Sequence, residues 1–419
     1  MCYRYLLAVQ LTLAFSLVTL AADWPQWRGP ERNGLSKETG LAKDWPKEGP
    51  KLLWQAKEIG DGYSTPAVVG ERLYLISNEG IENEYIHALS VTDGKEVWRT
   101  TIGKVGPNQG PQYPGTRSTP TIDGDVLYAL GSNGDLVCLN IADGKEQWRK
   151  DLRKDFEGKP GKWAYAESPL VDGDVLVIAP GGSKATIVAL HKKSGDIFWE
   201  TAIPEGDEAA YASAMIVEVG GLKQYVEFLS KGLVGVEAKT GKLLWRYEKT
   251  AQNSPANIPT PLVQDQFVYS AAGRSGGGLV QLKVAGSTVE AEEVYFTPKL
   301  PTAIGGAVLL DGNLYGTNGQ GLLCADLKTG EIKWQERGIG AGSVCYADGC
   351  LYVHGESGEV ALVQVAPDAY HEKGRFTPPD APKKGPGKAW AYPVIANGRL
   401  YIREMGTLWC FDVSVSAAK

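Results

Sequence analysis

An internal repeat most constrains how this 419-residue chain can fold. The clearest unit spans residues 118–149 and contains four short apolar segments, separated by turns rich in Gly and Asp. Short strands between such turns are typical of an antiparallel meander, so we expect each unit to form one four-stranded sheet. Because the same order of segments recurs along the chain, the sequence predicts an array of similar sheets.

Seven units are followed by an eighth that is incomplete. The seven begin near Ser64, Ser118, Ser168, Ser213, Thr260, Gly306 and Ser343. The eighth, residues 392–411, lacks its outer strand, and residues 51–55 have the form of that missing strand. A ring removes its last open sheet edge when the two ends of the chain pair. We therefore predict an all-β fold, an eight-bladed β-propeller with four-stranded antiparallel blades and N-to-C strand closure. An open solenoid is the alternative, but solenoids cap their ends with distinct polar repeats.

Large aromatic residues recur at one position of the outer strand, where they are expected to pack adjacent blades together. They are Trp54, Trp98, Trp148, Trp199, Trp245 and Trp334, with Tyr295 and Phe376 as expected substitutes in two irregular blades. Small residues recur at one position of the third strand, where we expect sheets to approach closely: Ala88, Cys138, Ala189, Gly235, Cys324 and Cys410.

The N-terminus has the pattern of a signal peptide. Residues 1–22 contain Arg4, then an apolar stretch, then Ala21 and Ala22. A transmembrane anchor is the alternative, but the stretch is shorter than the roughly 20 residues that a bilayer needs. We expect a signal peptide over 1–22, an N-terminal strap over 23–50, the propeller over 51–413 and a tail over 414–419. The protein should then be periplasmic or secreted, soluble after cleavage and without a transmembrane segment.

Cysteine content and charge narrow the possible chemistry. In an oxidising compartment Cys345 and Cys350, which flank a tight turn, could pair across a hairpin, or both could be unpaired buried thiols. The net charge of −6 argues against a nucleic-acid partner, because such binding needs clustered Lys and Arg. None of the four His residues has a metal-like spacing, so a His-rich zinc site is not expected.

The outer-strand segments 93–99, 143–149 and 240–246 resemble the tryptophan-docking repeat of pyrroloquinoline quinone (PQQ) propellers. The resemblance covers roughly residues 51–413, and a chain of this length with no added domain is similar to the BamB-type, PQQ-like repeat proteins. Residues 23–34 resemble the leader of the same proteins, and they could either form a strap that covers the ring or line a ligand site. The tryptophans of the leader and of the loops stand outside the docking position, so a ligand is expected first near them. The family includes quinone-dependent alcohol dehydrogenases and non-catalytic assembly scaffolds, and fold alone does not decide between them.

A binding site is expected on the loops that join each outer strand to the next inner strand, because they gather on one face of a rigid ring. The candidate residues there are Arg117, Trp163, Glu167, Tyr211, Asn257 and Trp390. Tyr63, Tyr165 and Tyr392 also stand just before inner strands. The alternative is that these side chains only pack the mouth of the ring. We expect two further charged pairs, His354 with Glu356 and Arg403 with Glu404, to be solvated hairpin residues rather than catalytic ones.

The resemblance implies roles for these residues if the chain is a quinone enzyme. Trp163 or Trp390 would stack on PQQ, Arg117 would pair with its carboxylates, and Glu167 and Asn257 would offer oxygen ligands to calcium. Two signatures of such enzymes are missing, a vicinal Cys-Cys pair and a C-x-x-C-H haem motif.

The preferred prediction is therefore a monomeric, non-catalytic binding or assembly scaffold of the cell envelope, without a cofactor. Its partner would be an envelope protein or polymer on the loop face. The alternative is a PQQ-dependent oxidoreductase that acts on an alcohol or a sugar, with PQQ and calcium as cofactors.

Overall fold

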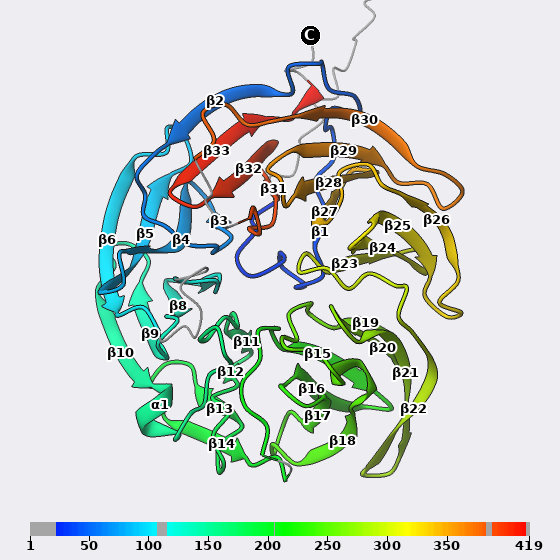
Figure 1. Ribbon diagram of the computed structural model, residues 1–419. Helices are drawn as coiled ribbons and strands as arrows, with labels where there is room; N and C mark the ends of the chain where they lie inside the picture. The colour runs from blue at the N-terminus through cyan, green and yellow to red at the C-terminus, as the bar shows by residue number, and fades with distance from the viewer. Residues whose placement is uncertain (1–21, 107–114, 205, 383–387, 416–419) are drawn as a thin grey trace, which may run out of the picture.

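The computed structural model describes residues 22–106, 115–204, 206–382 and 388–415. Eight antiparallel blades surround a central axis, and the predicted eight-bladed β-propeller is confirmed (Figure 1). Nearly all of the predicted signal peptide lies outside the described residues. None of the helices in the described ranges is long and apolar enough to span a membrane.

Each blade is a meander in which the first strand lies nearest the axis. Blade 1 consists of β3 (Ala67–Val69), β4 (Arg72–Glu79), β5 (Asn83–Ser90) and β6 (Glu96–Gly103). Blade 2 consists of β7 (Thr121–Asp123), β8 (Val126–Leu130), β9 (Asp135–Asn140) and β10 (Glu146–Asp151), and the short helix α1 (Leu152–Asp155) follows it. Blade 3 consists of β11 (Leu170–Asp172), β12 (Val175–Ile178), β13 (Ile187–His191) and β14 (Ile197–Thr201). Blade 4 consists of β15 (Met215–Val219), β16 (Leu222–Phe228), β17 (Leu233–Glu237) and β18 (Leu243–Tyr247).

The second half of the ring repeats this plan. The 3-10 turn η1 (Lys249–Ala251) leads into blade 5, which consists of β19 (Leu262–Gln264), β20 (Phe267–Ala272), β21 (Gly276–Ala285) and β22 (Thr288–Thr297). Blade 6 consists of β23 (Ala307–Leu310), β24 (Asn313–Asn318), β25 (Gly321–Asp326) and β26 (Ile332–Glu336). Blade 7 consists of β27 (Gly342–Ala347), β28 (Cys350–Gly355), β29 (Val360–Gln364) and β30 (His371–Phe376). Blade 8 consists of β31 (Val394–Ala396), β32 (Arg399–Glu404), β33 (Thr407–Asp412) and the N-terminal β2 (Lys51–Ala56).

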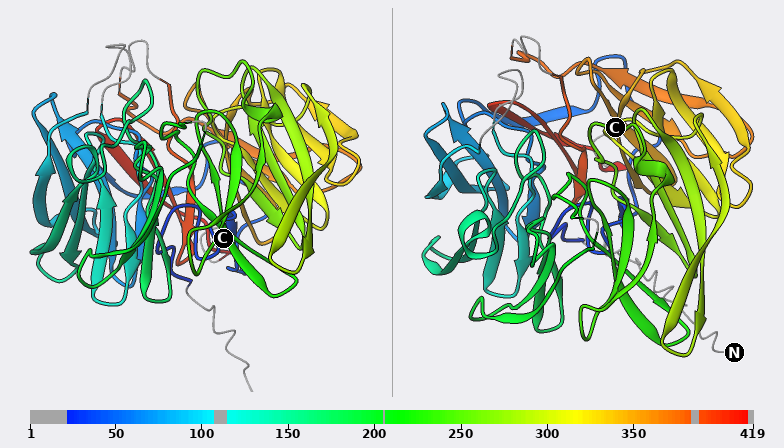
Figure 2. Two further views of the ribbon diagram at one scale, coloured as in Figure 1. Left: turned by 90° about the horizontal axis from the view of Figure 1, so that it is seen from below. Right: turned by 60° about the horizontal axis from the view of Figure 1, so that its bottom comes forward.

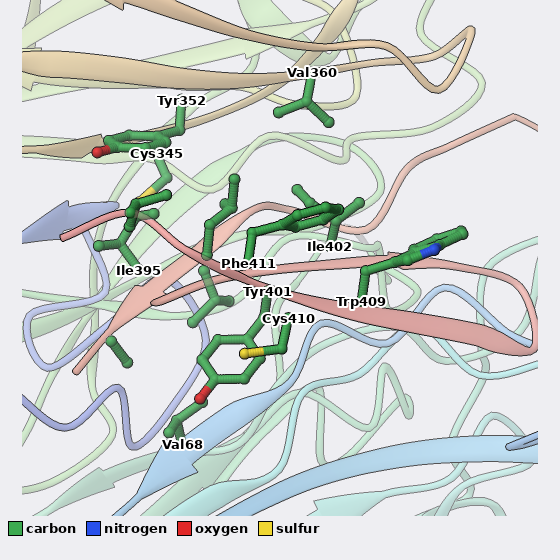
Figure 3. Close-up of a cluster of buried hydrophobic side chains, with 14 of the residues drawn as sticks. Val68, Cys345, Tyr352, Val360, Ile395, Tyr401, Ile402, Trp409, Cys410 and Phe411 are labelled. Carbon is green, nitrogen blue, oxygen red and sulfur yellow. The ribbon is translucent and has the colours of Figure 1, made fainter. Parts of the chain in front are cut away.

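The ring closes in blade 8, as predicted. There β2 pairs antiparallel with β33, so that Trp54 lies opposite Cys410. The sulfur of Cys410 lies against the ring of Tyr401 in the core of this blade (Figure 3). Blade 7 departs from the expected four strands, because the two-residue β1 (Leu35–Ser36) adds a parallel strand to its inner edge.

The docking tryptophans pair directly with the recurring small residues of the third strand. The pairs are Trp54 with Cys410, Trp98 with Ala88, Trp148 with Cys138, Trp199 with Ala189, Trp245 with Gly235 and Trp334 with Cys324. A small residue is needed beside the indole within the same sheet: a Cβ on Gly235 would lie 2.1 Å from Trp245 Nε1. These small residues also lie in core clusters that join neighbouring blades, as expected: Cys138 of blade 2, for example, is grouped with Leu176 and Val188 of blade 3.

Most of these indoles also bond to the next blade. Trp199 Nε1, for example, donates to the carbonyl of Ala238 in blade 4 at 3.0 Å. Tyr295 is confirmed as a substitute: it occupies the docking register opposite Leu279, and its hydroxyl donates to Leu327 O at 2.8 Å.

The prediction for Phe376 was wrong. Phe376 pairs with Val360 at the end of β30, whereas Gly374 occupies the docking register opposite Leu362. A Cβ on Gly374 would lie 2.6 Å from Cβ of Trp45, a residue of the N-terminal strap. The Trp45 ring lies 5.7 Å from that of Tyr352 and 5.4 Å from that of Phe376. The strap thus supplies the docking tryptophan that blade 7 lacks.

The strap, residues 23–50, crosses the inside of the ring (Figures 1 and 2). It makes a hydrogen bond or a strand pairing with every blade. In blade order, these are Trp24 N to Val68 O, Ile122 N to Pro25 O, Arg32 Nη2 to Ser168 O, Arg32 Nε to Ala214 O, Trp27 Nε1 to Thr260 Oγ1, Arg28 Nη2 to Ala307 O, β1 with β27, and Gly398 N to Glu38 Oε2. A segment with contacts this widely spread is part of the propeller's core.

The five cysteines in the described ranges are free and buried. Cys345 lies opposite Tyr352 and Cys350 lies opposite Ala347, so the two thiols are not each other's cross-strand partners. Burial raises the pKa of the Cys345 thiol to about 12, as expected for an unreactive core residue. Of the two alternatives, the structure therefore has unpaired thiols.

Candidate functional site

A central pocket of about 290 Å³ opens where the chain enters the inner strands. Seven blades contribute residues that stand two to seven positions before an inner strand, and the strap contributes one. The lining consists of Trp27, Tyr63, Thr65, Arg117, Trp163, Ala166, Tyr211, Ala256, Ile258, Ile304, Trp390 and Tyr392. Because each of these loops is held by a sheet, the pocket has a rigid frame.

Six aromatic rings dominate the lining and form three contacting pairs. The ring centroids of Trp27 and Tyr392 lie 4.7 Å apart, those of Tyr63 and Trp390 lie 5.0 Å apart, and those of Trp163 and Tyr211 lie 5.9 Å apart. Because these aromatic rings already contact one another, they would lose little conformational entropy when a ligand stacks on them.

Arg117 is the cation of the lining. Its Nη1 donates to the carbonyls of Gly115 at 2.9 Å and Trp163 at 3.1 Å, and its guanidinium lies 5.6 Å from the centre of the Tyr63 ring. Burial lowers the pKa of Arg117, while Tyr63, Tyr211 and Glu84 oppose that shift. An arginine remains charged at neutral pH even so, and the pocket therefore carries a positive charge among aromatic walls.

The wall formed by residues 390–392 has its own support. Trp390 Nε1 donates to Glu356 Oε1 at 3.2 Å, and Lys388 forms an ion pair with the same carboxylate. His354 Nδ1 lies 2.9 Å from Ala391 O, and its Nε2 lies 3.4 Å from Glu404 Oε1.

These contacts correct the expectation of solvated hairpin charges. His354, Arg403 and Glu404 are buried, with exposed fractions of 0%, 0% and 2%. Arg403 Nη1 donates to the carbonyls of Ser64 and Ile76, each at 2.8 Å, and burial lowers its pKa to about 9. Since these groups bond to backbone and neighbouring side chains behind the pocket wall, they position the wall.

Four of the six predicted site residues line the pocket: Arg117, Trp163, Tyr211 and Trp390. Glu167 and Asn257 do not. In both loops the neighbours line the pocket, Ala166 beside Glu167, and Ala256 with Ile258 around Asn257. Successive side chains of an extended chain point to opposite sides. Because their neighbours point into the pocket, the side chains of Glu167 and Asn257 point away from it.

Glu167 and Asn257 instead satisfy buried backbone. Glu167 Oε2 accepts a hydrogen bond from Ala179 N at 2.8 Å, and Asn257 Nδ2 donates to Leu229 O at 2.7 Å. Burial raises the pKa of Glu167 to about 8, against the Ala179 N–H bond and the positive charge of Arg32.

Sequence reasoning missed part of the site. Tyr63 and Tyr392 were named only as neighbours of inner strands, and Trp27 only as one of several leader tryptophans near which a ligand was expected, yet all three line the pocket. Their position before an inner strand could have identified the two tyrosines. The signal for Trp27 was its position outside the docking repeat, but its exact place in the pocket depends on the path of the whole strap.

The lining does not fit a calcium-bound quinone. Calcium takes several carboxylate, amide or carbonyl oxygens, and no carboxylate or amide side chain is among the lining residues. Across the described ranges, no group of three or more His, Cys, Asp and Glu residues could hold a metal ion.

Two known proteins are similar in sequence to more than half of this chain. It is 25% identical over 296 residues to the outer membrane protein assembly factor BamB of Shewanella oneidensis, covering 68% of this chain and 67% of that one. It is 23% identical over 279 residues to the tetrathionate hydrolase of Acidithiobacillus ferrooxidans, covering 62% of this chain and 51% of that one. The chain thus spans about half to two thirds of these relatives.

Solved structures share the fold. BamB from Moraxella catarrhalis superposes with a TM-score of 0.60 at 15% identity, covering 86% of this chain and 97% of that one. The quinohemoprotein alcohol dehydrogenase from Comamonas testosteroni superposes with a TM-score of 0.67 at 14% identity, covering 93% and 80%. Residues 82–336, more than half of the chain, match the family described as outer membrane protein assembly factor BamB. The chain therefore belongs to this family of PQQ-like repeat propellers.

Proposed function

We propose that this chain is an exported, non-catalytic binding scaffold of the cell envelope whose loop face receives a protein partner. The observation that carries the proposal is the composition of the central pocket, in which Trp, Tyr and Arg side chains meet at the middle of a rigid ring. These three residue types dominate the binding energy of protein interfaces and cluster near the interface centre.

Two further observations support a scaffold. The chain's family is named for assembly factors, and the lining offers aromatic contact surface rather than the oxygen ligands of a quinone site. The relative called quinoprotein alcohol dehydrogenase PedH, from Pseudomonas putida, is 24% identical over 169 residues. A quinone enzyme is therefore the competing function that an experiment has to exclude.

Photo-crosslinking in the cells that make the chain tests the scaffold. A photoreactive amino acid would replace Lys162 or Arg274, exposed residues at the rim of the loop face, or Glu71, an exposed turn residue at the other end of the blades. We expect one and the same protein, identified by mass spectrometry, to crosslink at both rim positions and not at Glu71. The absence of rim-specific adducts would overturn the proposal.

A second measurement addresses the competing enzyme. The purified chain would be titrated with PQQ and Ca²⁺ while its tryptophan fluorescence and dye-linked alcohol oxidation are followed. The scaffold predicts no turnover. Saturable turnover that is lost in Arg117→Ala would establish the quinone enzyme instead.

A further inference from the structure

A second cavity of about 150 Å³ adjoins the central pocket between blades 5 and 6. Ala256, Ile258 and Ile304 line both spaces. The second cavity is further lined by Ser254, Pro255, Pro259, Gly273, Arg274 and Thr302. The aromatic pocket and the smaller cavity are thus separated by a shared apolar wall, and the exposed Arg274 lines the smaller cavity.

The volume of the central pocket limits what can fill it. A protein cavity of about 150 Å³ lined by apolar side chains is large enough to bind benzene. At about 290 Å³, the central pocket has room for one single-ring or fused-ring aromatic group. A Tyr or Trp side chain is such a group, and it would meet rings on several sides, where edge and offset contacts are favourable.

The second cavity favours an acidic neighbour, because Arg274 is the one charged residue among those that line it. Lys162 Nζ lies 5.3 Å from the Trp163 ring centroid, and Arg274 is exposed at the second cavity. The carboxylate of Glu356 is engaged by Trp390 and Lys388. An acidic group that reaches this cavity would therefore be attracted to Arg274, and a basic group would be repelled by it.

We propose that the central pocket receives one aromatic side chain of the protein partner, carried on an extended segment in which an acidic residue near that ring lies at Arg274. This inference rests on the proposed function and adds the chemistry of the partner. In extended chain each residue advances the backbone by about 3.3 Å, so an acidic residue within two positions of the ring can reach the adjoining cavity.

Short dye-labelled peptides test the inference by fluorescence anisotropy with the purified chain. The probe is the blocked peptide Gly-Ser-Trp-Gly-Asp-Gly, with two controls in which Ala replaces Trp or Lys replaces Asp. We expect loss of the ring to weaken binding about tenfold or more, as for a central interface anchor. Reversal of the acidic residue should weaken it about three- to tenfold, and less at high salt.

Variants of the chain locate the two contacts. Ile258→Trp fills the shared wall and should abolish binding of the Trp peptide. Arg274→Glu changes an exposed side chain and should reverse the preference, so that the Lys peptide binds better than the Asp peptide. Arg337→Glu, at an exposed arginine that lines neither cavity, is the matched control and should leave both affinities unchanged.

Three outcomes would overturn the inference. One is peptide binding that does not depend on the ring. Another is unchanged peptide preference in Arg274→Glu. The third is tight binding of naphthalene-2-carboxylate without binding of any peptide, which would indicate a small-molecule site. If the rim crosslinks persist in Ile258→Trp, the scaffold stands and the aromatic anchor fails; if rim crosslinks never form, the scaffold itself fails.

Discussion

Blades 6 and 7 are neighbours built on one plan, yet they are joined to the ring differently. In blade 6, Tyr315, Cys324 and Trp334 lie side by side across three strands, and Trp334 Nε1 donates to Ala366 O at 2.9 Å. In blade 7 the matching positions are Tyr352, Leu362 and Gly374. Its docking indole, Trp45, comes from a segment more than 300 residues away in sequence.

This difference shows that the propeller does not depend on identical repeats. A blade that loses its own docking residue keeps its contact when another part of the chain fills the same space with a similar ring. The strap is thus a functional replacement for one repeat element, and it places Trp27 in the pocket at the same time.

Removal of residues 22–50 tests the difference between blades 6 and 7 with the largest expected effect. The deletion removes Trp45 from blade 7 and the strap contacts of all eight blades, while β2 and the closure of blade 8 remain. We expect loss of the cooperative thermal unfolding transition, measured by calorimetry and circular dichroism. The control is Lys37→Ala, at an exposed strap residue, which should unfold like the parent. A deletion variant that also unfolds like the parent would show that the strap only covers the ring.

Single substitutions compare how much the strap tryptophan and a tryptophan within a blade contribute to the free energy of unfolding. Trp45 and Trp199 are each 8% exposed, so Trp45→Ala and Trp199→Ala should each lower the free energy of unfolding by about 3–5 kcal/mol. Trp199 Nε1 donates to Ala238 O, whereas Trp45 Nε1 is buried without a hydrogen-bond partner. Trp199→Phe should therefore cost about 1 kcal/mol more than Trp45→Phe in urea unfolding. Nearly no cost for Trp45→Ala would contradict a docking role.

The last effect concerns the surroundings of Arg32, the anchor of the strap between blades 3 and 4. Its neighbours Glu167 and Glu227 are buried; burial raises the pKa of Glu167 to about 8 from 4.5, and burial together with the charge of Glu167 raises that of Glu227. The folded chain thus keeps a proton that the unfolded chain releases, so the free energy of unfolding falls as pH rises from about 4.5 to 8.

Glu167→Gln cannot ionise and should flatten this decrease, as measured by urea unfolding between pH 5 and pH 8. Glu71→Gln, at an exposed turn residue, should leave the slope of the parent unchanged. Equal slopes in all three proteins would mean that Glu167 does not titrate in this range.

The ring itself could be predicted from the sequence because its determinants repeat. Five of the six docking tryptophans follow the glycine of their turn by four residues, and the incomplete eighth unit matches residues 51–55. Blade 7 broke the prediction because Gly374 carries no ring, and Phe376, two residues later, was the nearest aromatic residue. A repeat pattern cannot indicate that a distant residue fills a gap.

The pocket was predictable only in outline. Position before an inner strand selected the correct loops, but not the direction of each side chain. One residue's difference in an extended loop separates Ala166, which lines the pocket, from Glu167, which is buried beside Arg32. The direction of each side chain depends on the backbone torsion angles. Irregular loops lack the regular alternation of a strand, so these directions cannot be predicted from sequence position alone.

The path of the strap also determines when the molecule can be completed. The strap stands near the start of the chain, but its partners include Gly398 and Val413 near the end. Those contacts cannot form until the last blade has been synthesised. The strap is therefore synthesised early but reaches its native position last. An unfinished or damaged ring would therefore leave Trp24, Trp27 and Trp45 uncovered, and these three indoles would distinguish an incomplete molecule from a finished one.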